Sequence, residues 1–258
     1  MMIKILRELY KVMKFSYIFI LVLLLASCKS KKNDNDVITP VTELYNNALI
    51  LLKKNKYNDA ANEFGKIFLQ HPGNSITPQA ELMHAYSLFL ATEYEEAVDV
   101  LDIFIKLHPL NVDIAYAYYL KGIAYYMQIS NVRLDQSSTS LAKASFDDVI
   151  KRFPTTKYAI DASLKIDLVN DHLAGKEMEL GRYYLRAQNP IAGIVRFQSV
   201  INQYQTTSHT PEALYRLVVG YKSLGLSDEA KKYASVLGYN YPDSAWYKHA
   251  YALVAKEE

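Results

Sequence analysis

Six histidines and one cysteine are the side chains of this chain best suited to catalysis or metal binding. Four of the histidines have no partner at a metal-binding spacing such as HExxH: His84, His172, His209 and His249. His71 and His108 occupy the repeat position that Phe153 fills elsewhere, so we interpret them as packing residues at helix ends. Phosphate-binding glycine loops and nucleophile elbows are absent, and no glutamate precedes a serine as in lytic transglycosylases. The sequence therefore predicts no catalytic residue, no metal site and no cofactor, and we do not expect an enzyme.

Cys28 is the one thiol whose surroundings predict a chemical role. A lone cysteine excludes an internal disulfide and any cysteine-based metal cluster. Cys28 follows Leu25-Ala26-Ser27, which resembles the bacterial lipobox, in which the thiol is acylated and becomes the mature N-terminus. Each buried lipid methylene is worth about 0.8 kcal/mol, so two or three acyl chains hold a protein firmly at a membrane. We therefore expect a covalent lipid on Cys28.

Residues 1–27 are typical of a lipoprotein signal peptide. Eleven mostly apolar residues, 15–25, follow Lys11 and Lys14, and a stable membrane-spanning helix needs about 20 such residues. Translation could begin at Met1 or at Met13, because both starts precede a complete signal. Lys29 follows the cysteine, where an aspartate favours retention in the inner membrane, so we expect an outer-membrane protein facing the periplasm. Residues 28–41 are polar and carry mixed charge, which predicts a lipidated tether.

Charge and composition restrict the fold and the partners expected for the chain after residue 27. The first 27 residues hold four basic side chains and one acidic side chain, so 25 basic and 26 acidic side chains remain. A nearly neutral body argues against nucleic acid as a partner, because nucleic-acid binding usually needs a basic surface. Glycine (9) and proline (8) are scarce among 258 residues, which favours helices over a β-sandwich.

A repeated pattern predicts the architecture. Five segments align on an early small residue: Ala60, Ala97, Ala142, Gly193 and Ala230. Four positions later come Phe64, Leu101, Phe146, Phe197 and Ala234, and seven positions later Ile67, Phe104, Val149, Val200 and Leu237. Eleven positions later come His71, His108, Phe153, Tyr204 and Tyr241, and a proline follows four of these five. Offsets of 0, 4 and 7 follow one helical face, and the proline predicts where the helix stops.

A second helical stretch precedes each aligned segment, so the repeat unit is a helical hairpin that resembles the tetratricopeptide repeat. We predict an all-α, right-handed α-solenoid of about five such hairpins over residues 42–258, with a capping helix at 244–256. The expected repeats are approximately 42–73, 76–110, 113–155, 157–207 and 210–244. Extra residues at 127–140 are interpreted as a loop. Those at 165–176 should lengthen the next helix, which Gly175 and Gly181 could kink.

Solenoids of helix pairs usually bind protein segments, and tyrosine is abundant at 22 residues. We interpret the tyrosines between 116 and 126, and at 183 and 184, mainly as aromatic filler between helices. The alternative is that some of them line a binding groove, because tyrosine provides large contact area at low entropic cost.

Three stretches, together with the lipobox, resemble the BamD family, the tetratricopeptide lipoproteins of the β-barrel assembly machinery: residues 131–154, 173–204 and 212–247. The most specific is LAGKEMELGRYYLRAQNPIAGIVRFQSVINQY at 173–204. The resemblance implies a non-catalytic subunit that binds the barrel protein BamA through its C-terminal repeats, with further assembly lipoproteins as possible partners. It also implies that unfolded outer-membrane proteins are recognised by the N-terminal repeats, here residues 42–127. The family's partner-binding arginine matches Arg196, and Arg182 and Arg186 are looser basic candidates.

Two other functions fit a lipid-anchored helical repeat. One is an envelope adaptor that coordinates cell division or peptidoglycan synthesis. Such proteins commonly carry a coiled coil before their repeats, and no heptads precede the first hairpin here. The other is a lipid-anchored hydrolase, for which the sequence offers no catalytic constellation.

Overall fold

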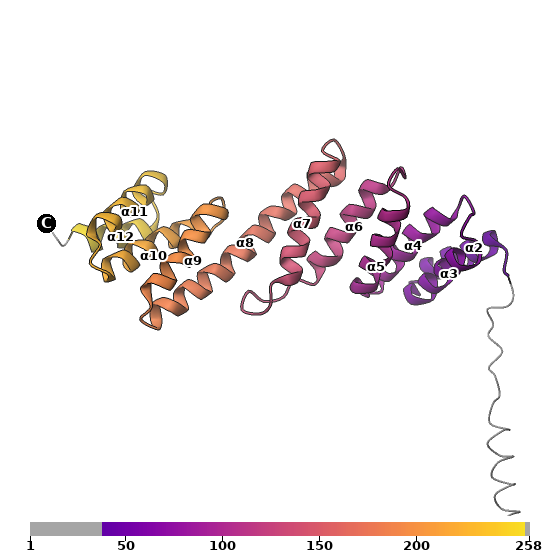
Figure 1. The fold of residues 1–258 in the computed structure, drawn as a ribbon, viewed down its shortest axis with the longest axis horizontal. Coiled ribbons are helices and arrows are strands. Elements are labelled where there is room, and N and C mark those ends of the chain that lie inside the picture. Colours follow the sequence, from indigo (N-terminus) through magenta and orange to yellow (C-terminus); the bar gives the residue numbers. More distant parts are fainter. Residues whose placement is uncertain (1–37, 256–258) are drawn as a thin grey trace, which may run out of the picture. The chain divides into compact units, whose positions relative to one another are not determined.

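The structure is a computed structural model that describes residues 38–255. Within this range the chain forms helices and no strands, and Figure 1 shows the helices following one another in chain order. Their bounds are α2 (Val41–Lys53), α3 (Tyr57–Gln70), α4 (Thr77–Leu90), α5 (Tyr94–Leu107), α6 (Ile114–Met127), α7 (Ser137–Arg152), α8 (Lys157–Arg186), α9 (Pro190–Gln203), α10 (Thr210–Ser223), α11 (Ser227–Asn240) and α12 (Ala245–Val254).

Each helix packs mainly on the helices before and after it in the chain, as in a helical-repeat solenoid. The predicted all-α fold is therefore confirmed. The helix pairs α2–α3, α4–α5, α6–α7, α8–α9 and α10–α11 occupy the spans of the five expected repeats, and α12 occupies the span of the expected capping helix. The right-handed sense of the solenoid stays a prediction.

The second helix of each pair ends at the residue that the repeat pattern indicated. Those C-cap residues share φ between −125° and −138° and ψ between 35° and 55°: His71, His108, Phe153, Tyr204 and Tyr241. Each cap N–H donates to the backbone carbonyl four residues earlier, as His71 does to Ile67. The accepting residues are the buried ones aligned with Ile67 in the repeat pattern. The proline that follows four of these caps disfavours further helix, so the sequence itself ends the element.

The turns inside four hairpins use a residue in the left-handed region. Asn55, Thr92, Gln188 and Gly225 have φ of 57°, 66°, 56° and 74°, and each lies two residues before the next helix begins. Because three of them are not glycine, the sequence carried little signal for these turns. The α6–α7 connection differs because it is a longer loop of residues 128–136.

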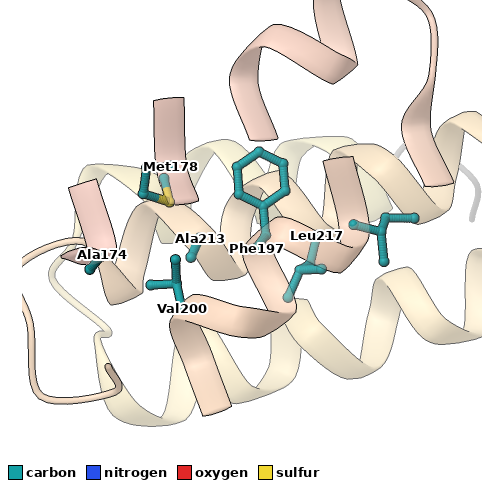
Figure 2. Packing of buried hydrophobic residues seen from close by; sticks show 7 residues of the cluster. Ala174, Met178, Phe197, Val200, Ala213 and Leu217 are labelled. Carbon is teal, nitrogen blue, oxygen red and sulfur yellow. The ribbon is translucent and has the colours of Figure 1, made fainter. Parts of the chain in front are cut away.

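The aligned small and bulky positions form the core. All of them are buried, and the bulky ones, together with Ala142 and Ala230, belong to five hydrophobic clusters that follow one another along the chain. Figure 2 shows one of them, in which Met178 of α8, Phe197 of α9 and Leu217 of α10 converge. Small residues sit where helices cross, because the backbones must approach closely there.

The 30-residue helix α8 confirms that residues 165–176 lengthen the helix entering the fourth repeat. Gly175 and Gly181 are both buried within this single helix. A Cβ at Gly181 would overlap the ring of Phe197, so this glycine lets α9 approach α8. The expected loop at 127–140 is shorter than predicted, because α7 begins at Ser137, whose N–H donates to Asp135 Oδ2 at 3.1 Å.

The predicted signal peptide (1–27), the lipidated Cys28 and all of the tether (28–41) except residues 38–41 lie outside the described residues. Among residues 38–255, none of the helices is both long enough and apolar enough to cross a membrane.

Candidate partner-binding surface

Arg182 of α8 lies between two carboxylates. Its Nη2 is 2.6 Å from Glu179 Oε1 on the same helix, and its Nη1 is 3.0 Å from Glu212 Oε2 on α10. The three side chains are only 16–24% exposed. Hydrogen bonding from Arg182 lowers the pKa of the Glu179 carboxyl below its ordinary value. Arg182 therefore joins the fourth repeat to the fifth and has little capacity left for a separate partner.

The ion pairs of Arg182 extend in both directions. Arg133, in the α6–α7 loop, places its Nε 3.2 Å from Glu179 Oε2. Arg216 of α10 donates from Nε to Glu212 Oε1 at 3.1 Å, and its guanidinium lies over the ring of Trp246 in α12 at 5.7 Å. Three arginines and two glutamates thus connect the loop before α7 to the end of the solenoid.

Arg196 lies on α9 and is held more loosely. Its Nη1 is 3.3 Å from Glu177 Oε2 of α8, and its side chain is 40% exposed. One such contact engages a single N–H of a guanidinium that carries five donors in a planar fork. Arg196 can therefore pair with a carboxylate on another protein while it keeps or exchanges Glu177.

Apolar side chains lie exposed on the same helix as Arg196. Ile191 is 65% exposed and Val195, the neighbour of Arg196, is 56% exposed. Tyr183 of α8 is 58% exposed, and its ring lies 5.5 Å from that of Tyr184 in an edge-on arrangement. Apolar residues beside an arginine are typical of the centre of a protein interface.

Arg186 occupies the last turn of α8 and is exposed, with no ion pair to another described residue. Its charge is favourable at that place, because the C-terminal end of a helix carries partial negative charge. The three arginines therefore differ in how many ion pairs they make within the fold. Arg182 is fixed within the fold, Arg196 is half engaged, and Arg186 points to no defined partner.

The acidic partners of these arginines were missed by the sequence reasoning. Glu179–Arg182 and Glu212–Arg216 have the i,i+3 and i,i+4 spacings of helical ion pairs, which could have indicated them. Arg182–Glu212 and Arg196–Glu177 join different helices and need the packing of α8 against α9 and α10 to be known.

The tyrosines between 116 and 126 lie mostly between helices. Rings of Tyr116 and Tyr119 contact that of Tyr158 at 5.5 and 5.3 Å, and the Tyr119 hydroxyl donates to Asp161 of α8. Burial raises the pKa of Tyr116, and burial followed by this hydrogen bond raises that of Tyr119. Aromatic filler is the better description of this group, whereas Tyr183, near the C-terminal end of α8, is exposed.

The histidines show no arrangement for metal binding. Within residues 38–255 no group of three or more His, Cys, Asp or Glu side chains is placed to hold a metal ion. His108, at the end of α5, places Nε2 2.9 Å from Glu81 Oε2 of α4, so this packing residue also partners a buried carboxylate.

Helical hairpins that stack on one another in chain order define a helical-repeat protein. The model of the YfiO family, described as an outer membrane lipoprotein, matches residues 38–237. That match covers most of the chain, so this protein belongs to the YfiO family.

Curated relatives agree with the family match. The chain is 66% identical over 239 residues to the outer membrane protein assembly factor BamD of Rickettsia prowazekii (strain Madrid E), covering 93% of this chain and 95% of the relative. It is 44% identical over 232 residues to BamD of Caulobacter vibrioides, covering 89% of this chain and 76% of the relative. Among solved structures it is similar to the TPR domain of P58(IPK), with 16% identity, a TM-score of 0.44 and coverage of 84% and 57%.

Proposed function

We propose that this chain is a lipid-anchored scaffold subunit of the β-barrel assembly complex, and that it acts by binding rather than by catalysis. It docks a BamA-type barrel protein and helps to recognise and insert unfolded outer-membrane proteins. Support comes from membership of the YfiO family and from relatives named outer membrane protein assembly factor BamD. The observation that carries the docking proposal is the half-engaged Arg196 on an α9 surface with exposed apolar side chains.

The docking surface is assigned to α9 and the adjoining end of α8. Arg196 supplies a guanidinium for a carboxylate of the barrel protein, and Ile191, Val195 and Tyr183 supply apolar area around it. Arg182 joins α8 to α10, the two helices on which α9 packs, so its contribution to docking is one of positioning. Arg186 adds positive charge that steers an acidic partner toward the same end of α8.

The remaining parts of the proposal concern the two ends of the chain. A lipid on Cys28 holds the protein at the outer membrane facing the periplasm, and residues 28–41 act as the tether. The N-terminal repeats, residues 42–127, recognise unfolded substrates. Other assembly lipoproteins are further partners, and no nucleic acid is involved.

Arg196→Glu tests the docking surface. The new carboxylate faces Glu177 at about the place of the present ion pair and repels an acidic partner, so co-purification with the barrel protein from detergent-solubilised membranes should fall about tenfold or more. Far-UV circular dichroism should show unchanged helicity, because Arg196 is 40% exposed and lies outside the core.

Arg152→Glu is the matched control. Arg152 lies on α7 and is paired with Asp148 at 3.3 Å in a similarly loose, exposed contact. Co-purification of this variant should equal that of the parent protein. Unchanged co-purification of Arg196→Glu, or an equal loss with both variants, would refute the assignment of the docking surface to α9.

A further inference from the structure

A separate apolar groove lies in the N-terminal repeats, between α3 and α5. Both helices pack on α4, and they leave a hollow of about 860 Å³ above it. Its walls include Phe68 and Leu69 of α3 and Val100 and Ile103 of α5. Phe68, Leu69 and Ile103 are 36%, 77% and 48% exposed, so aliphatic and aromatic surface faces solvent along this hollow.

The floor of the groove is formed by α4 and is shaped by one glycine. Gly65 of α3 faces His84, and a Cβ there would lie 3.2 Å from His84 Cε1. Burial lowers the pKa of His84, so its ring is neutral at the base of the groove near pH 7. Glu81 is 5% exposed and is engaged by His108 at 2.9 Å. The floor thus presents little free charge to an occupant.

The rim of the groove is acidic. Asp59 and Glu63 of α3 line it together with one ammonium, Lys66. Lys66 is 2.5 Å from Glu63 Oε1, so these two charges cancel and Asp59 is left as the free carboxylate of this wall. The neighbouring solvent face of α5 adds three carboxylates that form no ion pair with a described residue, against one lysine: Glu95, Glu96, Asp99 and Lys106. Its fourth carboxylate, Asp102, is paired with Lys121 of α6 at 2.5 Å. Within the described residues Asp59 and Asp99 have no ion pair. An apolar groove with such a rim is complementary to an apolar face flanked by positive charge.

We propose that this groove binds an amphipathic helix of another protein that carries apolar side chains along one face and lysine or arginine on either side. A helix satisfies its own backbone hydrogen bonds. The helical walls of the groove offer no free backbone N–H or C=O to an extended strand, whose polar groups would depend on lining side chains such as Asn62 or on water. This inference is independent of the docking of a barrel protein, because it concerns α3–α5 and not α9. It lies within the N-terminal repeats to which the proposed function assigns unfolded substrates, and it adds to them a ligand of another kind, an amphipathic helix with basic flanks.

Binding of designed peptides to the full chain in uncharged detergent tests the proposal. The probe is a labelled leucine–lysine helix of about 18 residues, five turns long, and its twin has glutamate in place of every lysine. Fluorescence anisotropy should show the lysine peptide binding at least about tenfold more tightly, with an affinity that falls as salt is added. A third peptide of the same leucine and lysine content, arranged in strict alternation, represents an extended occupant and should bind about tenfold more weakly than the helix.

Three variants locate the binding. Ile103→Asn should weaken it about tenfold, and Asp59→Lys should weaken it several-fold while reducing its salt dependence. The matched control is Ile160→Asn, which changes an isoleucine of α8 that is 66% exposed and should leave affinity unchanged. Circular dichroism verifies that all three variants remain helical.

Several outcomes would overturn the proposal: no binding, equal affinity for the glutamate twin, equal or tighter binding of the alternating peptide, or the same loss in Ile103→Asn and Ile160→Asn. Sedimentation of the full chain gives a further outcome that would overturn the proposal. If the chain is a dimer and Ile103→Asn dissociates it, the occupant of the groove is a second copy of this chain. If Arg196→Glu loses docking of the barrel protein but still binds the lysine peptide, the α9 surface and the α3–α5 groove are separate binding sites.

Discussion

At the scale of single residues, the closest packing in the fold depends on glycine. Gly181 of α8 faces the fully buried ring of Phe197, and Gly181 O lies 3.2 Å from the place that a Cβ on Gly193 would occupy. Overpacking typically costs about 1–3 kcal/mol, and alanine returns about 1 kcal/mol of helix propensity, so Gly181→Ala should lower the free energy of unfolding by up to about 2 kcal/mol. Urea denaturation measures this change.

Gly175→Ala is the matched control on the same helix. The added Cβ would lie 3.3 Å from Val132 Cγ1 and from His209 Nε2. Val132 belongs to the α6–α7 loop and His209 is 27% exposed, so both can shift slightly. The helix-propensity gain should then leave stability unchanged or raised by up to about 1 kcal/mol. An equal loss in both variants would mean that the Phe197 contact is not what requires glycine.

The residues at helix ends and at helix crossings could be predicted from the sequence, because the same residue types recur there in each repeat. The cap column from His71 to Tyr241 and the small residues at the crossings recur in all five hairpins, so period and proline placement were sufficient. The left-handed residues Asn55, Thr92 and Gln188 share position but not type, and no glycine or motif indicated them. Thr92 is the extreme case, because a β-branched side chain disfavours φ of 66°.

At the scale of elements, the contact of α3 with α4 contains a titratable group, the imidazole of His84. His84 of α4 is largely buried against Gly65, and burial lowers its pKa below the ordinary 6.5. The folded state therefore favours the neutral imidazole. This contribution to stability is fully present above pH 6.5 and is lost as pH falls through the lowered folded-state pKa.

His84→Leu should make the protein less sensitive to acid. The parent protein should lose more free energy of unfolding than the variant between about pH 7.5 and pH 5.5, as measured by urea midpoints. Glu81 acts in the opposite sense, because burial raises its pKa above 4.5 and its contribution is lost as pH rises. The comparison is therefore repeated in a Glu81→Gln background, where the difference should persist. Parallel pH profiles of parent and variant would contradict the assignment.

The elements of the site were less accessible to sequence reasoning than the elements of the fold. The helical pattern across residues 165–176 predicted that α8 is long, and the family resemblance implied Arg196 as a partner contact. Nothing in the pattern distinguished Arg182, which bridges to Glu212 on another helix, from the looser Arg196. The difference arises from the packing of α8 against α10 and α9. This packing brings Arg182 and Glu212, which are 30 residues apart in the chain, and Arg196 and Glu177, which are 19 residues apart, within ion-pair distance.

At the scale of the whole described chain, α8 contributes to two cores, as α4 and α10 also do, but it serves them with its two successive halves. Its first half contributes Ala159, Ala162 and Val169 to the cluster with α6 and α7, and its second half contributes Ala174 and Met178 to the cluster with α9 and α10. In a solenoid, such nearest-neighbour contacts determine how far unfolding spreads.

A proline in the middle of α8 should therefore uncouple the two ends of the repeat array. Leu168 is 59% exposed, so Leu168→Pro acts mainly on the backbone and should cost about 3 kcal/mol or more. The single tryptophan, Trp246 in α12, reports the C-terminal repeats by fluorescence, whereas far-UV circular dichroism reports all helices. In Leu168→Pro the two urea midpoints should move apart, while in the control Leu168→Gln they should keep the parent relation. If both midpoints fall together in the proline variant, the repeats are coupled by contacts other than the continuity of α8.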